Sequence, residues 1–193
     1  ANYELMLKCD EIEAEETDDP LERVQIFRRA SEIAEVGLSQ HGRAFELLGK
    51  AFRDGSSDPD LRQFIEDLER LSETIDGAEK LTELYREVGP DILDADLQIH
   101  CYLKVAQIAN TILENRELAR EYYVKVLDLD GENTEATDAL ERIYEDLERW
   151  VDLFEIYRRK NQYAEDDDTR KTILFNQARL CEEKLEDLSG AVL

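Results

Sequence analysis

The feature that most constrains this chain is an internal repeat. Residues 68–87 (LERLSETIDGAEKLTELYRE) align with residues 140–159 (LERIYEDLERWVDLFEIYRR) at an offset of 72, with eight identities. Small residues recur at similar spacing, because Ala44, Ala119 and Ala191 are separated by 75 and 72 residues. Self-similarity at a fixed period is typical of proteins built from stacked supersecondary units. The chain is therefore predicted to consist of units of about 72–75 residues.

Apolar residues recur at helical spacing almost throughout the chain. Ile99, Tyr102, Leu103 and Ala106 trace one helical face, for example. No run of strict apolar and polar alternation is bounded by turn residues, so no strand is predicted. We expect helices near 3–16, 21–38, 41–54, 59–75, 77–89, 93–113, 115–129, 134–147, 149–164 and 168–185, with a further helix from about 187.

Each unit then holds two helical hairpins joined by short connections. A single hairpin cannot bury its own apolar face, and stacked neighbours supply the cover. The predicted fold is all-α, an α-solenoid of antiparallel helical hairpins with about 10–11 helices. We interpret residues 1–193 as a single helical-repeat domain and as a segment of a longer array. Its predicted parts are a partial repeat (1–20), unit one (21–92), unit two (93–166) and the start of unit three (167–193).

Charge restricts the partners. The formal net charge is −24, and the basic residues occur singly or in short groups. A field of that sign repels phosphate backbones and anionic membrane surfaces, so neither nucleic acid nor a membrane is predicted as a partner. No apolar run approaches the roughly 20 residues that span a bilayer, and the N-terminus lacks the pattern of a signal peptide. A cytoplasmic location is favoured.

The segment LAREYYVKVLDLDGEN (118–133) resembles the second helix of a tetratricopeptide repeat. Ala119 matches that family's small residue at the helix crossing and Tyr123 its aromatic residue, while Gly131 replaces the family's usual proline. The segment LERWVDLFEIY (147–157) resembles the next such helix, with Leu153 in the small-residue place. AREYY is also similar to half-a-tetratricopeptide repeats, and the chain looks most like large acidic tetratricopeptide proteins of bacteria. The resemblance implies a scaffold or adaptor.

The loop LDLDGEN (127–133) raises an alternative, a calcium site. A helix–loop–helix calcium loop that starts at Asp128 needs glycine at position 6 and glutamate at position 12. This chain has Asn133 and Ala139 there. The favoured interpretation is a hinge, in which Gly131 stops one helix in a left-handed conformation and Asn133 caps the next helix.

Other candidate chemistry is also weighed against structural roles. Cys9, Cys101 and Cys181 fall at small or apolar positions of the repeat, so we predict buried free thiols. Neither His41 nor His100 has a ligand partner four residues further along its helix. The acidic runs at 15–19 and 166–168 are interpreted as helix caps, with a loosely bound divalent cation as the alternative. Trp150, Tyr157 and Tyr122–Tyr123 are predicted to lie between helices. No catalytic residue, cofactor or metal ligand is predicted.

The leading hypothesis is a non-catalytic module that binds a peptide or partner helix in the groove of the superhelix. The resemblance places these residues in the groove: Arg28, Glu32, Glu35, His100, Gln107, Asn110, Asp138, Arg142, Arg179 and Glu182. Their mixed charge with acid in excess predicts a basic or mixed-charge protein partner. The alternatives are a structural spacer, with end-to-end self-association through uncapped repeats, and a regulatory repeat region attached to an enzyme domain elsewhere.

Overall fold

The computed structural model describes residues 2–185, and within that range it is all-helical, with no strand. The helices are α1 (Tyr3–Glu16), α2 (Pro20–Glu32), α3 (His41–Asp54), α4 (Leu61–Thr74), α5 (Ala78–Val88), α6 (Ala95–Thr111), α7 (Arg116–Leu129), α8 (Thr134–Asp146), α9 (Trp150–Tyr163) and α10 (Asp167–Glu183). These confirm the predicted helices between 3 and 185, except that the helix expected over 21–38 is divided. Ala191 and the helix expected from 187 lie outside the described residues.

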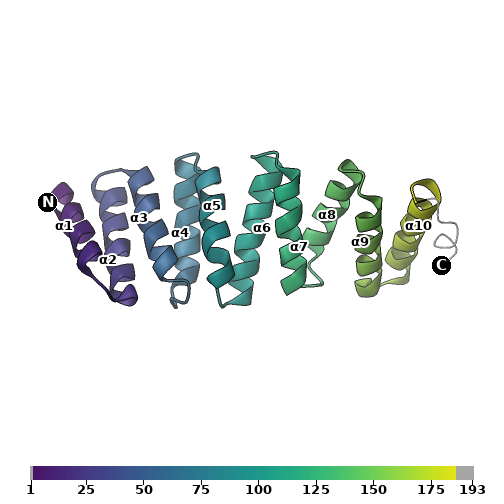
Figure 1. Ribbon diagram of the computed structural model, residues 1–193, viewed down its shortest axis with the longest axis horizontal. Coiled ribbons are helices and arrows are strands. Elements are labelled where there is room, and N and C mark those ends of the chain that lie inside the picture. The colour runs from purple at the N-terminus through teal and green to yellow at the C-terminus, as the bar shows by residue number, and fades with distance from the viewer. Residues whose placement is uncertain (1, 186–193) are drawn as a thin grey trace. The chain divides into compact units, whose positions relative to one another are not determined.

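The chain divides into two compact units, Ala1–Glu114 and Asn115–Leu193. Within the first unit each helix from α1 to α6 packs against the next, and α3 also contacts α5 (Figure 1). Within the second unit α7 to α10 pack in the same sequential way (Figure 1). The division falls between α6 and α7, inside the predicted unit two. The predicted repeat borders at 92/93 and 166/167 stay predictions.

Positions that align in the sequence repeat have matching burial. Leu68 and Leu140 are both fully buried. Tyr85 is also fully buried, and the aligned Tyr157 is only 4% exposed. The other buried pairs are Leu71/Ile143, Leu81/Leu153 and Leu84/Ile156. The aligned charged pairs Arg70/Arg142, Glu73/Glu145, Glu83/Glu155 and Arg86/Arg158 are exposed. The period of 72 residues therefore describes a repeated packing surface, and α4–α5 and α8–α9 are equivalent hairpins.

The first helix of each hairpin ends in the same kind of turn. Ser39, Asp76, Glu114 and Glu148 have positive φ angles of 55°, 50°, 51° and 53°. Ser39, Asp76 and Glu148 each follow the first helix of a hairpin, and the chain reverses there into the second helix. Glu114 follows α6 at the end of the first unit. Backbone bonds close the turn, such as Gly77 N–H to Ser72 O (2.8 Å) and Arg149 N–H to Tyr144 O (2.8 Å). A left-handed non-glycine residue costs about 1–2 kcal/mol, so this turn is held by the packing of the hairpin.

Acidic and amide side chains cap the helices, as predicted. The Asp19 carboxylate accepts a hydrogen bond from Leu21 N–H (2.9 Å) at the start of α2. The Asp166 carboxylate accepts from Asp168 N–H and Thr169 N–H at the start of α10. Asn133 accepts from Ala136 N–H (3.0 Å) at the start of α8. The capping interpretation of both acidic runs is therefore confirmed.

The predicted left-handed stop at Gly131 is wrong. No glycine among residues 2–185 has a positive φ angle. Instead α7 ends because Asp130 is extended (φ −130°, ψ 93°), and its carboxylate accepts a hydrogen bond from Glu132 N–H (3.2 Å) and another from the Asn133 side-chain amide (3.0 Å). A side-chain turn at Asp130 replaces the glycine stop, because aspartate can bond to the backbone two residues on.

The thiol prediction holds for two cysteines and fails for the third. Cys101 and Cys181 are buried, whereas Cys9 is exposed. Cys9 occupies the repeat position of Ile156, which is buried on α9 between α8 and α10. Among the described elements α1 packs against α2 and the Ile33–Gly37 segment. The face that carries Cys9 therefore lacks the cover that Ile156 has. Tyr122, Tyr123 and Tyr157 are buried as predicted, and Trp150 is half-buried.

The predicted helix 21–38 is divided. The α-helix ends at Glu32, and Ile33–Gly37 form one wider π-helical turn before the chain reverses at Ser39. A methyl group built on Gly37 would lie 2.7 Å from Cγ of Tyr3. A side chain at position 37 would therefore displace Tyr3 where α1 approaches this turn.

Candidate functional site

An open cleft lies between α2 and α4, the first helices of two successive hairpins. It has a volume of about 500 Å³ and is called the α2–α4 cleft. It is lined by Gln25, Arg28, Arg29, Ser31, Glu32, Glu35, Leu48, Phe64, Asp67 and Arg70. Three of the predicted groove residues, Arg28, Glu32 and Glu35, therefore meet at one site.

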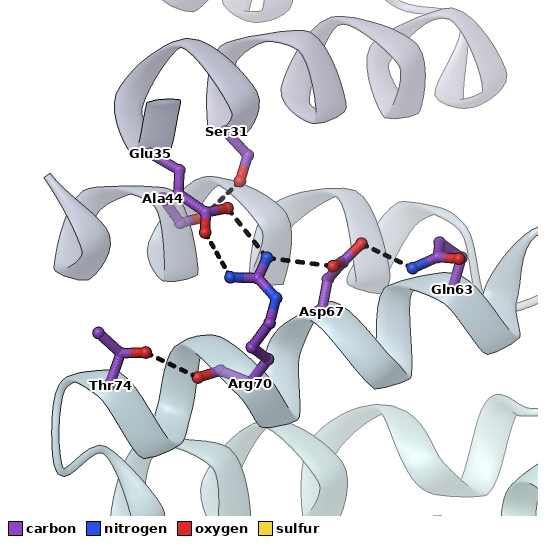
Figure 2. A network of polar contacts seen from close by, with 7 residues as sticks. All are labelled: Ser31, Glu35, Ala44, Gln63, Asp67, Arg70 and Thr74. Atoms are coloured by element: carbon purple, nitrogen blue, oxygen red, sulfur yellow. Dashed lines mark hydrogen bonds and ion pairs between the residues drawn. The ribbon is translucent and has the colours of Figure 1, made fainter. Parts of the chain in front are cut away.

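Glu35 and Arg70 connect the two sides of the α2–α4 cleft. The Arg70 guanidinium donates to both carboxylate oxygens of Glu35, one at 3.0 Å, and also to Asp67 at 3.1 Å (Figure 2). The Gln63 amide donates to the second oxygen of Asp67 at 3.1 Å. The hydrogen bonds from Arg70 lower the pKa of Glu35. A bidentate hydrogen bond of this kind fixes the positions of both side chains. The carboxylate of Glu35 is therefore already used in an internal ion pair.

Arg28 is held by a different pair of contacts. Its guanidinium donates to Asp60 at 2.9 Å and lies over the Phe64 ring, 4.9 Å from the ring centre. Phe64 and Leu48 are themselves buried and form an apolar floor. These two contacts hold the Arg28 side chain, which comes from α2, against Asp60 and Phe64 on the opposite side of the cleft.

Glu32 differs from the other charged residues that line this cleft, because it has no ion pair within the described residues. Arg29 is paired with Asp10 at 2.7 Å, and the other lining charges are paired as described above. Glu32 is exposed, and it has no ion pair within residues 2–185. It is therefore the carboxylate of this cleft that is available to a partner.

A second cluster joins α4 to α6. His100 Nε2 lies 2.7 Å from Glu69 Oε1, and Lys104 Nζ lies 2.8 Å from Glu69 Oε2. Burial opposes ionisation of Glu69, but the hydrogen bonds from His100 and Lys104 outweigh it and lower the pKa of Glu69. The Tyr85 hydroxyl lies 3.5 Å from the same carboxylate. The predicted groove residue His100 is thus an exposed side chain that contacts a partly buried acid.

Replacing Glu69 by glutamine is expected to remove a pH-dependent part of the stability. Because the folded pKa of Glu69 is lowered, its contribution is present above the unfolded value near 4.3 and is lost as pH falls through the folded value. We expect a loss of about 1 kcal/mol near pH 7 that shrinks below about pH 4. Urea unfolding across this range measures the effect. Glu66→Gln, on the exposed face of the same helix, is the control, and a loss that stays constant with pH contradicts the assignment.

The remaining predicted groove residues are distributed over α6, α8 and α10. Gln107 lines a second cleft described below, and Asn110 is half-buried on α6. In the second unit the Asp138 carboxylate accepts from Lys160 at 2.5 Å. Arg179 lines a small cleft of about 120 Å³ with Trp150. Arg142 and Glu182 are exposed.

Sequence reasoning missed the two charged residues that α4 contributes to the α2–α4 cleft. Asp67 and Arg70 lie on α4 and complete the charged wall. A signal existed for Arg70, because it aligns with Arg142, a predicted groove residue, in the 72-residue repeat. Asp67 has no such counterpart, since the aligned residue is Ala139.

Two groups that could carry covalent chemistry have raised pKa values. Burial raises the pKa of the Cys101 thiol, which disfavours the reactive thiolate. Burial also raises the pKa of Tyr157 to about 12, with Glu141 adding to the shift. No group of three or more histidine, cysteine or acidic side chains within the described part of the chain could hold a metal ion.

Comparison with known proteins gives no family. No family model matches the chain, and a search of the curated proteins finds no match. Over residues 2–185, no helix combines the length and apolar character needed to cross a membrane.

Proposed function

We propose that this chain is a non-catalytic, tetratricopeptide-like interaction module. In this proposal a peptide or partner helix binds to the face formed by the first helices of successive hairpins. The observation that carries it is the α2–α4 cleft, which is open, lies between two such helices and contains the three groove residues expected on the helix 21–38. The α-solenoid arrangement and the relationship to tetratricopeptide repeats are parts of the same proposal.

Electrostatics support a basic or mixed-charge partner. The net charge of −24 attracts cations over long range. At short range Glu32 is exposed and has no ion pair in the described residues, whereas Glu35 is already bonded to Arg70. An incoming lysine or arginine therefore meets an available carboxylate at Glu32 without breaking an internal ion pair.

Reversing the charge of Glu32 is expected to weaken binding of a basic peptide. The probe is a panel of short fluorescent peptides of basic, mixed and acidic composition, titrated with the full chain by fluorescence anisotropy at low and high salt. For Glu32→Lys we expect a loss of about 5- to 10-fold in affinity for the basic peptides at low salt, because a favourable contact becomes a repulsive one.

Glu83→Lys is the matched control. Glu83 is exposed on α5, the second helix of its hairpin, and its substitution changes the net charge by the same amount. Equal losses for the two variants would show that only the overall charge matters. The proposal is contradicted by that result, or by a panel in which no basic or mixed peptide binds.

A further inference from the structure

A second cleft of the first unit differs in character from the α2–α4 cleft. It has a volume of about 450 Å³, is lined by residues of α4, α5 and α6, and is called the α4–α6 cleft. Its apolar lining consists of Ala78, Leu81, Ile108 and Ile112. Ile112 is 61% exposed, which leaves a large aliphatic side chain open to solvent at the end of α6. The site thus offers apolar surface that the fold does not itself cover.

Carboxylates without ion pairs accompany this apolar surface. Glu73 and Asp76 line the cleft, are exposed and have no ion pair within residues 2–185. The cation of the lining, Lys104, is already bound to Glu69 at 2.8 Å. The turn that closes α4 places Asp76 at the cleft in a left-handed conformation, with φ 50°. The cleft therefore combines an apolar wall with two acids that are not neutralised.

We propose that the α4–α6 cleft is the anchor site for a protein segment in which an aliphatic or aromatic side chain is flanked by lysine or arginine. The inference rests on the proposed function and names the partner's chemistry. A cavity of about 450 Å³ is in the size range of ligand pockets and accommodates one large side chain and part of the next. The apolar side chain covers the exposed Ile112, and the flanking cations meet Glu73 and Asp76.

Charge complementarity excludes the opposite partner. An acidic segment would place its carboxylates beside Glu73 and Asp76, and Lys104 is occupied by Glu69. A purely basic segment would leave the exposed Ile112 uncovered and lose the apolar contribution. The α2–α4 cleft differs on this point, because its lining charges other than Glu32 are paired and its apolar residues, Leu48 and Phe64, are both buried, whereas the α4–α6 cleft carries the exposed Ile112.

The test uses the full chain and a short fluorescent peptide with one leucine flanked by lysines. Two matched peptides replace the leucine by alanine or the lysines by glutamate. The leucine–lysine peptide is expected to bind, the alanine peptide to bind about 10-fold more weakly, and the glutamate peptide not to bind. The affinity of each peptide for the chain is measured by fluorescence anisotropy at low salt.

The chain variants locate the site. Glu73→Gln with Asp76→Asn is expected to weaken the leucine–lysine peptide about 3- to 10-fold. Asparagine is chosen because it tolerates the left-handed conformation of residue 76. Ile112→Ser is expected to reduce the advantage of leucine over alanine in the peptide. Glu66→Gln, on the exposed face of α4 and outside the cleft lining, is the control and is expected to change affinity less than 2-fold. Circular dichroism spectra and melting curves establish that each variant is folded.

The outcomes separate this inference from the proposed function. If the leucine–lysine peptide binds and Glu32→Lys alone weakens it, the α4–α6 cleft is not the anchor site, while the wider proposal stands. The same conclusion holds if leucine and alanine peptides bind equally. If no peptide of either panel binds the wild-type chain, both proposals fail. Loss of binding in the Glu73/Asp76 and Ile112 variants, with Glu66→Gln unchanged, supports the anchor site.

Discussion

Replacing Tyr85 by alanine is expected to lower the free energy of unfolding of the first unit by about 3–5 kcal/mol. Tyr85 is completely buried on α5, and its ring centre lies 5.7 Å from that of Phe52 on α3. Its hydroxyl also approaches Ile65 O on α4 at 3.4 Å. The substitution leaves a cavity in the core shared by α3, α4 and α5, where the neighbouring side chains are already buried. Urea unfolding followed by circular dichroism measures the loss.

Tyr85→Phe is the matched control for this prediction. It keeps the ring and removes only the hydroxyl, whose distances to Ile65 O and to Glu69, 3.4 and 3.5 Å, are long for hydrogen bonds. We expect a loss of about 1 kcal/mol or less. Equal losses for the alanine and phenylalanine variants would show that the hydroxyl, rather than ring packing, joins the helices.

Replacing Leu140 by alanine is expected to lower the free energy of unfolding of the second unit by about 2–5 kcal/mol. Leu140 is completely buried on α8 and aligns with Leu68, which is completely buried on α4. Because the two positions belong to equivalent hairpins, Leu68→Ala is expected to cost the first unit a similar amount. Trp150, the single tryptophan, lies on α9 and reports unfolding of the second unit by its fluorescence. Hydrogen exchange of α4 and α5 reports the first unit.

Val151→Ala is the control for this pair of variants. Val151 is 68% exposed on α9, so truncation removes little buried surface, and we expect a change within about 0.5 kcal/mol. A small loss at Leu140 together with a large loss at Leu68 would contradict the structural equivalence of the two hairpins.

The helices could be predicted from the sequence because their apolar faces have to be covered by neighbouring helices. That requirement produces the spacing from which α1 to α10 were expected. The turns after the first helices of the hairpins were harder to predict from the sequence. Ser39, Asp76, Glu114 and Glu148 adopt a conformation that favours glycine, and none of them is glycine. At Gly131 the sequence suggested a left-handed helix stop that the structure does not have. The helix α7 ends at Asp130 instead.

The candidate site could be predicted in part. Arg28, Glu32 and Glu35 meet in one cleft because they are spaced at i, i+4 and i+7 along one helical face. Their internal partners were not predictable, since the bonds to Asp60 and Arg70 depend on how α4 packs beside α2. The apolar character of the α4–α6 cleft was also missed. It arises from Ile108 and Ile112 on α6 beside Ala78 and Leu81 on α5, and these residues are far apart in sequence.

The most direct test of the account is amide hydrogen exchange of the full chain with and without the tightest-binding basic peptide of the panels. We expect slower exchange in α2, α4 and α6, the first helices of their hairpins, and little change in α3 and α5. Protection confined to α3 and α5, or no protection at saturating peptide, would contradict binding on the face that these first helices form.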